Sequence, residues 1–178
     1  MRTGESSKWF RSVLLSCVAF AVSGCGAIGF DVEQKLPEQR IQKSALGGLL
    51  PALFPNPAKL TIDLKAEQEK RGTGPATKIF LKKLQFNITT TAMPAGNFDF
   101  LEEAHLFAES SAAGLPKVEI ATLKPVARGA SSVDFTIVPN VNLLPYVNAG
   151  AELSATATGA QPNSDVTFDG LLIIDVRI

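Results

Sequence analysis

Cysteine and histidine, the residues most used for nucleophilic and metal chemistry, are nearly absent from this chain of 178 residues. The two cysteines, Cys17 and Cys25, both fall near the N-terminus, and the single histidine is His105. The sequence after Cys25 therefore excludes a disulfide, a thiolate metal site and a cysteine nucleophile. One histidine is also too few for a zinc site built from imidazole ligands.

The short motifs of common enzyme classes are missing as well. No G-x-S-x-G nucleophile elbow occurs, and no glycine-rich loop precedes a helical segment, so nucleotide binding has no support. A Ser-His-Asp triad would have to use His105, which lies close to Glu103 in an alternating segment. We expect His105 to be an exposed strand residue on the polar face. We therefore expect no catalytic residue, no cofactor and no enzymatic activity.

The acidic residues offer one alternative, a weak calcium site. Asp165 and Asp169 lie near the end of the chain, an even number of positions apart, so their side chains would point to the same side of a strand. Together with a loop carbonyl they could bind calcium. Asp175 follows them on the same expected strand. No EF-hand or repeat-type calcium pattern accompanies them, so we expect solvated carboxylates and no metal. Glu102 and Glu103 are adjacent, and neighbours on a strand point to opposite faces.

The overall charge is balanced, with 17 basic and 17 acidic residues. The first 24 residues hold three of the basic residues and one of the acidic ones, so the remainder is mildly acidic. A nucleic-acid partner would need a basic face, and a polybasic membrane patch would need clustered cations. We expect neither.

The N-terminus has the three-part pattern of a secretory signal. Residues 1–11 are cationic, residues 13–22 (VLLSCVAFAV) are apolar, and Ser23-Gly24-Cys25 follows. An apolar run of this length is far below the roughly 20 residues that a transmembrane helix needs. A buried core helix is the other alternative, but it would not explain the cationic start or the Ser-Gly-Cys end. We expect residues 1–24 to be a signal peptide.

The segment Val22-Ser23-Gly24-Cys25 resembles the bacterial lipobox, in which an aliphatic residue and two small ones precede a cysteine. The resemblance implies cleavage between Gly24 and Cys25 and a diacylglyceryl group on Cys25, with an ordinary secreted protein as the alternative. Two or more acyl chains hold a protein firmly in a membrane. Gly26 follows Cys25, which resembles lipoproteins sent on to the outer membrane. The membrane face, periplasmic or surface, stays open. Residues 25–29 would be the tether and residues 30–178 the folded domain.

The folded domain has the alternation and turn spacing of β-strands. The alternating segments are 30–33, 60–65, 79–88, 104–109, 118–121, 133–137, 153–158 and 166–178. They predict an all-β fold, a single immunoglobulin-like antiparallel β-sandwich of about eight strands, with a closed β-barrel as the alternative. Lys82-Lys83 breaks the period and predicts a bulge, and Gly170 predicts a kink in the last strand. Residues 66–71 (AEQEKR) are expected to continue the preceding strand as a charged edge, and residues 143–146 (LLPY) to form a short turn or 3₁₀ piece.

The segment Ala45–Pro57 (ALGGLLPALFPNP) is too rich in proline for a helix or a central strand. We expect a loop that plugs one end of the core. The alternative is an exposed apolar loop that contacts lipid or a partner through Leu49, Leu50 and Phe54. The short tether supports this alternative, because it keeps the domain close to the bilayer.

Two stretches, Asn56–Ile62 and Asp134–Gly170, resemble uncharacterised bacterial lipoproteins with a β-sandwich domain. The resemblance implies a fold and a location and no active site. The leading hypothesis is a membrane-anchored, non-enzymatic structural or binding module of the cell envelope, held through the lipid on Cys25 and with an envelope protein as its partner. The alternative is a carrier or chaperone that holds an apolar ligand or lipid between its sheets.

Replacing Leu49, Leu50 and Phe54 with serine in a non-lipidated chain distinguishes the two interpretations of the apolar loop. A core plug would lower the melting temperature by several degrees, because buried apolar area is lost. An interfacial loop would keep its melting temperature and lose binding to phospholipid vesicles. Thermal unfolding and vesicle co-sedimentation measure the two effects.

Overall fold

The computed structural model describes residues 29–43, 49–50, 58–59, 62–89, 96–110 and 113–178. Within these ranges the chain forms ten strands and two short helices. In chain order they are β1 (Gly29–Ile41), β2 (Leu49–Leu50), β3 (Ala58–Lys59), α1 (Leu64–Arg71), β4 (Lys78–Ile88), β5 (Leu101–Ser110), β6 (Leu115–Leu123), β7 (Ser132–Asp134), β8 (Thr136–Ile137), α2 (Leu144–Asn148), β9 (Glu152–Gly159) and β10 (Val166–Arg177).

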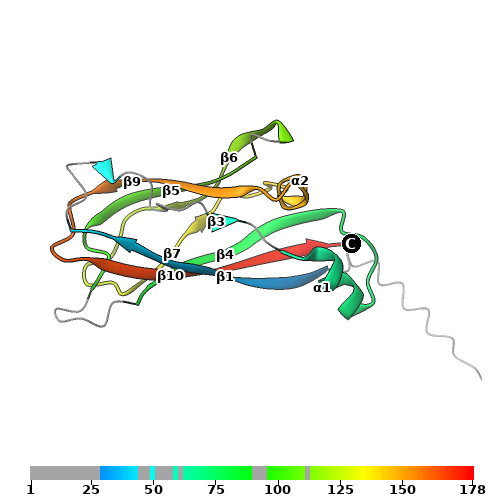
Figure 1. The fold of residues 1–178 in the computed structure, drawn as a ribbon, viewed down its shortest axis with the longest axis horizontal. Coiled ribbons are helices and arrows are strands. Elements are labelled where there is room, and N and C mark those ends of the chain that lie inside the picture. The colour runs from blue at the N-terminus through cyan, green and yellow to red at the C-terminus, as the bar shows by residue number, and fades with distance from the viewer. Residues whose placement is uncertain (1–28, 44–48, 51–57, 60–61, 90–95, 111–112) are drawn as a thin grey trace, which may run out of the picture.

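The strands form two antiparallel sheets that face each other as two layers (Figure 1). The first sheet has the order β1-β10-β4-β7. The second has the order β2-β9-β5-β6-β8, and β3 also pairs with β9. Neither sheet closes on itself, so the predicted all-β sandwich is confirmed and the barrel alternative is not observed.

The strand order differs from the constant-type immunoglobulin order in the position of the last strand. In the constant-type immunoglobulin order the first and last strands belong to different sheets. Here β10 lies between β1 and β4, and β1 pairs with it from Gly29 opposite Arg177 to Ile41 opposite Val166. The start of β1 therefore lies beside the end of the chain.

Alternation places one face of each sheet in the core. Along β10 every second residue from Val166 to Val176 is buried, and β5 shows the same period from Ala104 to Ser110. Phe86 on β4 lies at the centre, with its ring centroid 4.8 Å from that of Phe135 and 5.3 Å from that of Phe168. Tilted and edge-on ring pairs of this kind add to the stabilisation from apolar burial.

The expected strand at residues 133–137 is divided between the two sheets. β7 pairs with β4 in the first sheet, and β8 pairs with β6 in the second. Phe135 lies at the crossing, buried, with its N–H donating to the Leu84 carbonyl at 2.9 Å. Val133 and Phe135 are buried on both sides of the change, so the alternation continues while the partner strand switches.

The expectations of a strand at residues 60–65 and of its extension through residues 66–71 are wrong in the described residues, because Ile62 and Asp63 belong to no strand and α1 begins at Leu64. The Asp63 carboxylate accepts from the N–H of Ala66 at 2.9 Å, and Gly72 closes the helix with φ of 63°. These two caps satisfy backbone groups at the ends of the helix that have no partner within it. Residues 143–146 were expected to form a short turn or 3₁₀ piece, and residues 144–148 form α2, which has proline near its start.

The bulge predicted at Lys82-Lys83 is confirmed. The register of β4 against β10 shifts there, with Ile173 opposite Lys83 and Ile174 opposite Leu81. Lys82 is the extra residue, and the shift keeps Leu81 and Leu84 both buried.

Gly170, where a kink was predicted, lies within the continuous strand β10 and faces the core. A Cβ at this position would lie 2.9 Å from Leu36 Cδ1 and 3.0 Å from Phe86 Cδ1. The glycine thus makes room for the ring of Phe86 in a close-packed interior.

Gly170→Val should destabilise the protein by about 1–3 kcal/mol, because its side chain would force Leu36 and Phe86 apart. Urea unfolding followed by circular dichroism measures the change. Gly74→Val is the matched control, since Gly74 is exposed and a Cβ there would meet only Ile178, at 3.5 Å. Equal stability of the two variants would contradict this account of Gly170.

Candidate functional site

The proposed lipidation residues lie outside the part of the chain that the structure describes. Gly24, Cys25 and Phe54 are all beyond the described ranges. Leu49 and Leu50 form β2, opposite Thr158 and Ala157 of β9. Among the described residues no helix is long and apolar enough to cross a membrane.

Gly29 marks one end of the sandwich, where β1 begins beside α1 and the last residues of the chain (Figure 1). A hollow of about 540 Å³ lies here, lined by Gly29, Phe30, Asp31, Lys82, Asp175 and Arg177. We call the surface formed by Phe30, Arg71, Lys78, Phe80 and Arg177 the tether end. Its position follows from the register, because Gly29, Arg177 and Lys78 lie abreast on three adjacent strands.

Two guanidinium groups cover aromatic rings at the tether end. Arg71 lies over Phe30 with 4.6 Å between its Cζ and the ring centroid, and Arg177 lies over Phe80 at 4.7 Å. Both arginines keep large exposed fractions, 40% and 49% of the side chain. Arg71 Nε also donates to Glu67 at 3.3 Å, and Arg177 Nε donates to Asp175 at 3.0 Å. Because a guanidinium carries five N–H donors, each arginine keeps others that an acceptor could use, while the ring supplies apolar contact.

The acids at this end are paired with neighbouring cations. Asp31 accepts from Lys82 Nζ at 2.6 Å, and Asp175 accepts from Arg177 Nε at 3.0 Å. The hydrogen bond with Asp31 raises the pKa of Lys82, as does the charge of that carboxylate. The tether end is therefore a surface of local ion pairs and stacked rings.

β2 lies at the opposite end of the sandwich. β1 runs from Gly29 to Ile41, which pairs with Val166, and the turn before Val166 leads back to Gly159 and Thr158 on β9. Leu49 pairs with that same Thr158. A strand as long as β1 spans roughly 40 Å, so β2 and the tether end are separated by most of the length of the molecule.

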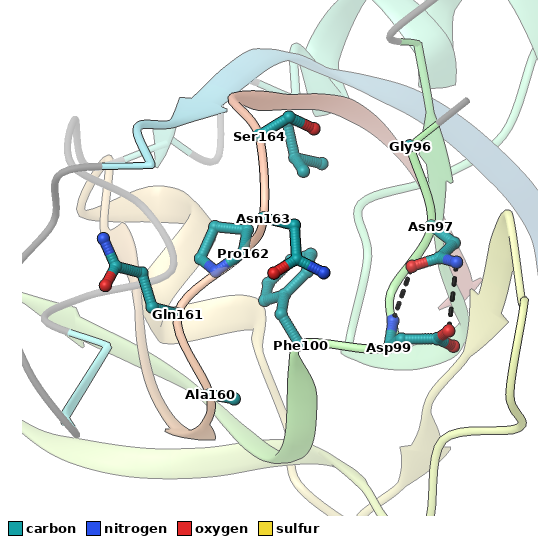
Figure 2. A pocket seen from close by; sticks show the side chains of 10 residues that line it. Gly96, Asn97, Asp99, Phe100, Ala160, Gln161, Pro162, Asn163 and Ser164 are labelled. Atoms are coloured by element: carbon teal, nitrogen blue, oxygen red, sulfur yellow. Dashed lines mark hydrogen bonds between the residues drawn. The ribbon is translucent and has the colours of Figure 1, made fainter. Parts of the chain in front are cut away.

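A second hollow of about 320 Å³ lies at this far end, and we call it the distal hollow (Figure 2). It is lined by Gly96, Asn97, Asp99, Phe100, Ala160, Gln161, Pro162, Asn163, Ser164 and Val166. Figure 2 shows the amide of Asn163 pointing toward Asn97 and Asp99 across the hollow. The turn at residues 161–164 is visible in the sequence, but nothing there indicates that it faces the start of β5.

The Asn97–Asp99 side of the distal hollow is held by hydrogen bonds. Asn97 Nδ2 donates to Asp99 Oδ2 at 3.0 Å, and its Oδ1 accepts from the N–H of Asp99 at 3.1 Å. The other Asp99 oxygen accepts from the N–H of Gly129 at 2.5 Å. The carboxylate is thus engaged by the protein, and amides dominate the remaining polar lining. This chemistry suits a neutral polar ligand or the polar part of a partner.

His105 lies on the outer face of the second sheet, half-buried between two carboxylates. Its Nε2 contacts Glu103 Oε1 at 3.2 Å, and its Nδ1 contacts Glu119 Oε1. Lys124 in turn donates to the second oxygen of Glu103 at 3.2 Å. The proximity of Glu103 is expected from the sequence, whereas Glu119 comes from β6 and only the strand pairing brings it close.

The cluster favours a protonated imidazole. The hydrogen bond with Glu119 raises the pKa of His105 most, burial opposes it, and the bond with Glu103 adds to it. The pKa of Glu103 is lowered, chiefly by the hydrogen bond from Lys124. Because both ring nitrogens face carboxylates, neither is placed to take a proton from a nucleophile.

The two aspartates considered for calcium, Asp165 and Asp169, and the nearby Asp175 have separate partners. Asp165 accepts from Arg40 Nη2 at 2.5 Å and from the N–H of Lys43 at 2.8 Å, and these bonds lower its pKa. Asp169 accepts from Asn87 at 3.4 Å, while Asp175 pairs with Arg177. Within the described ranges no group of three or more His, Cys, Asp or Glu residues could hold a metal ion.

The comparisons with known proteins do not identify a family for this chain. No protein-family model matches it, and no curated protein matches it significantly. Among solved structures, the crystal structure of the decameric BFDV capsid protein aligns with 85% of this chain and 100% of its own, at 13% identity and a TM-score of 0.42. A similarity this weak carries no argument about function.

NMR titration of His105 tests the cluster directly, because it is the only imidazole in the chain. We expect its pKa to lie above 6.5 and to fall in Glu119→Gln. Stability contributed by the raised pKa is fully present below pH 6.5 and is lost as the pH rises through the folded value. Glu109→Gln, on the same face of β5, is the control and should leave the pKa unchanged. A pKa at or below 6.5 would refute the cluster.

Proposed function

We propose that this protein is a lipid-anchored bacterial envelope protein that serves as a non-enzymatic structural or binding module. The observation that carries the proposal is the lipobox-like Val22-Ser23-Gly24-Cys25 at the end of a short apolar run. Cleavage before Cys25 and acylation of its thiol would fix the domain to a membrane. Gly26 after the cysteine favours the outer membrane.

The start of the fold supports this interpretation. β1 begins at Gly29, four residues after Cys25, one residue earlier than the sequence suggests. Pairing of β1 with β10 begins at Gly29 itself, opposite Arg177, so the described fold begins at the end of the proposed tether of residues 25–29.

The packing between the sheets favours a module over a carrier for an apolar ligand. The inward side chains of both sheets belong to one buried cluster, and Leu84, Phe86, Leu106 and Leu172 have no exposed surface. Aromatic rings from β4, β10 and the 132–137 crossing meet in its centre. A carrier would need room for its ligand in this layer, so we place recognition on the ends and faces of the sandwich.

The proposal of a non-enzymatic role rests on the placement of His105. Its two ring nitrogens face Glu103 and Glu119, and this arrangement stabilises the protonated imidazole on the surface of the sheet. The expected partners are therefore the membrane, through Cys25, and an envelope protein bound at an exposed surface.

Metabolic labelling with an alkyne fatty acid in a bacterial host tests the anchor. We expect the label on the wild type and on Cys17→Ser, because Cys17 lies within the cleaved segment. Cys25→Ser should lose the label and retain its signal peptide. Mass spectrometry of the mature N-terminus measures cleavage. An unmodified Cys25 thiol in the wild type would overturn the proposal.

A further inference from the structure

The distance between the proposed lipid and the fold limits how the domain can sit on its membrane. Four residues from Cys25 to Gly29 reach at most about 14 Å when fully extended. Acyl chains on Cys25 would hold that residue at the headgroup layer. Gly29 must then lie within the same short distance of the headgroups, a step that rests on the proposed function.

Within the described part of the chain, one end of the sandwich lies within that distance of Cys25. The register places Arg177 and Lys78 abreast of Gly29, and Arg71 of α1 donates to the Asp31 carbonyl at 3.3 Å. These contacts fix α1 and the ends of three strands around the entry point of the tether (Figure 1). The tether end is therefore the surface closest to the anchor.

The chemistry of the tether end suits a phospholipid headgroup layer. A guanidinium binds phosphate through paired N–H groups, and apolar side chains such as Phe can rest against the boundary between headgroups and acyl chains. Arg71 on Phe30 and Arg177 on Phe80 present both groups together. Asp31 is paired with Lys82, whereas Asp175 and Glu67 are paired with Arg177 and Arg71 themselves. Each arginine would therefore bind a phosphate through its remaining N–H groups while it keeps its carboxylate partner.

We propose that the tether end docks on the phospholipid headgroups of the membrane that holds the anchor, with Arg71 and Arg177 bound to lipid phosphates. The sandwich then stands on this end, and β1 extends roughly 40 Å away from the bilayer. The distal hollow and β2 face away from the membrane.

A chemical tether tests the docking independently of biosynthetic lipidation. In residues 25–178, Cys25 is the sole thiol and can be coupled to a maleimide lipid in phosphatidylcholine vesicles that contain a spin-labelled choline headgroup. The same chain lacks tryptophan, so Lys70→Trp, Lys78→Trp and Gln161→Trp each supply a single fluorophore. Lys70 and Lys78 are exposed near Gly29, and Gln161 is exposed at the distal hollow.

We expect the spin label to quench Lys70→Trp and Lys78→Trp at least threefold more than Gln161→Trp. Equal quenching at the two ends would mean that the domain tumbles or lies flat, and it would overturn the proposal. Because the lipid is attached by chemistry, this result does not depend on whether cells acylate Cys25. Failure of the docking and failure of the anchor are therefore separate outcomes.

Removing the two guanidinium groups separates docking from mere proximity. In the tethered Lys70→Trp chain, Arg71→Gln combined with Arg177→Gln should reduce quenching at least twofold. Arg40→Gln is the matched control, since Arg40 is an exposed, ion-paired arginine near the other end, and it should leave quenching unchanged. Unchanged quenching in the double variant, with circular dichroism showing the native sheet signal, would overturn the role of the arginines.

Discussion

The antiparallel pairing of β1 with β10 is the constraint on which the rest of the arrangement depends. It joins the first and last strands of the described chain from Gly29 opposite Arg177 to Ile41 opposite Val166. By placing β10 between β1 and β4, it buries every second residue of β10 against the second sheet. Because a slip of one residue would turn that face to solvent, the register is firmly set by burial. The same register fixes which side chains surround Gly29.

Sequence patterns predicted the features of the fold that depend on residues close together in the chain. The alternation of apolar and polar residues in β5 and β10 reflects the burial of one face of each strand, and the interruption of this alternation at Lys82 marks the bulge. The helix α1 is a local feature that the strand pattern predicted wrongly. The caps Asp63 and Gly72 are present in the sequence, and they determine the conformation of a segment with no buried residue of its own.

Features that depend on strand partners could not be derived in this way. Val133 and Phe135 alternate as in one strand, yet the chain passes from one sheet to the other at Phe135. Glu119 and His105 are neighbours only because β5 and β6 pair, with a register shift between Leu106 and Phe107. The distal hollow likewise combines residues 96–100 with residues 160–166. Such contacts between distant segments leave no periodic signal in one sequence.

The short interval between Cys25 and Gly29 links the sequence to the orientation of the domain. A long flexible linker would let a domain sample every orientation, because its reach grows with length. Here the four residues reach at most about 14 Å, whereas β1 spans roughly 40 Å. Because the tether is so much shorter than the strand, the far end of the domain cannot reach the anchor point. In the proposed anchoring, the β1–β10 register therefore determines more than the core. It selects the stacked arginines as the surface nearest the lipid and places the amide-lined hollow where another envelope component can reach it.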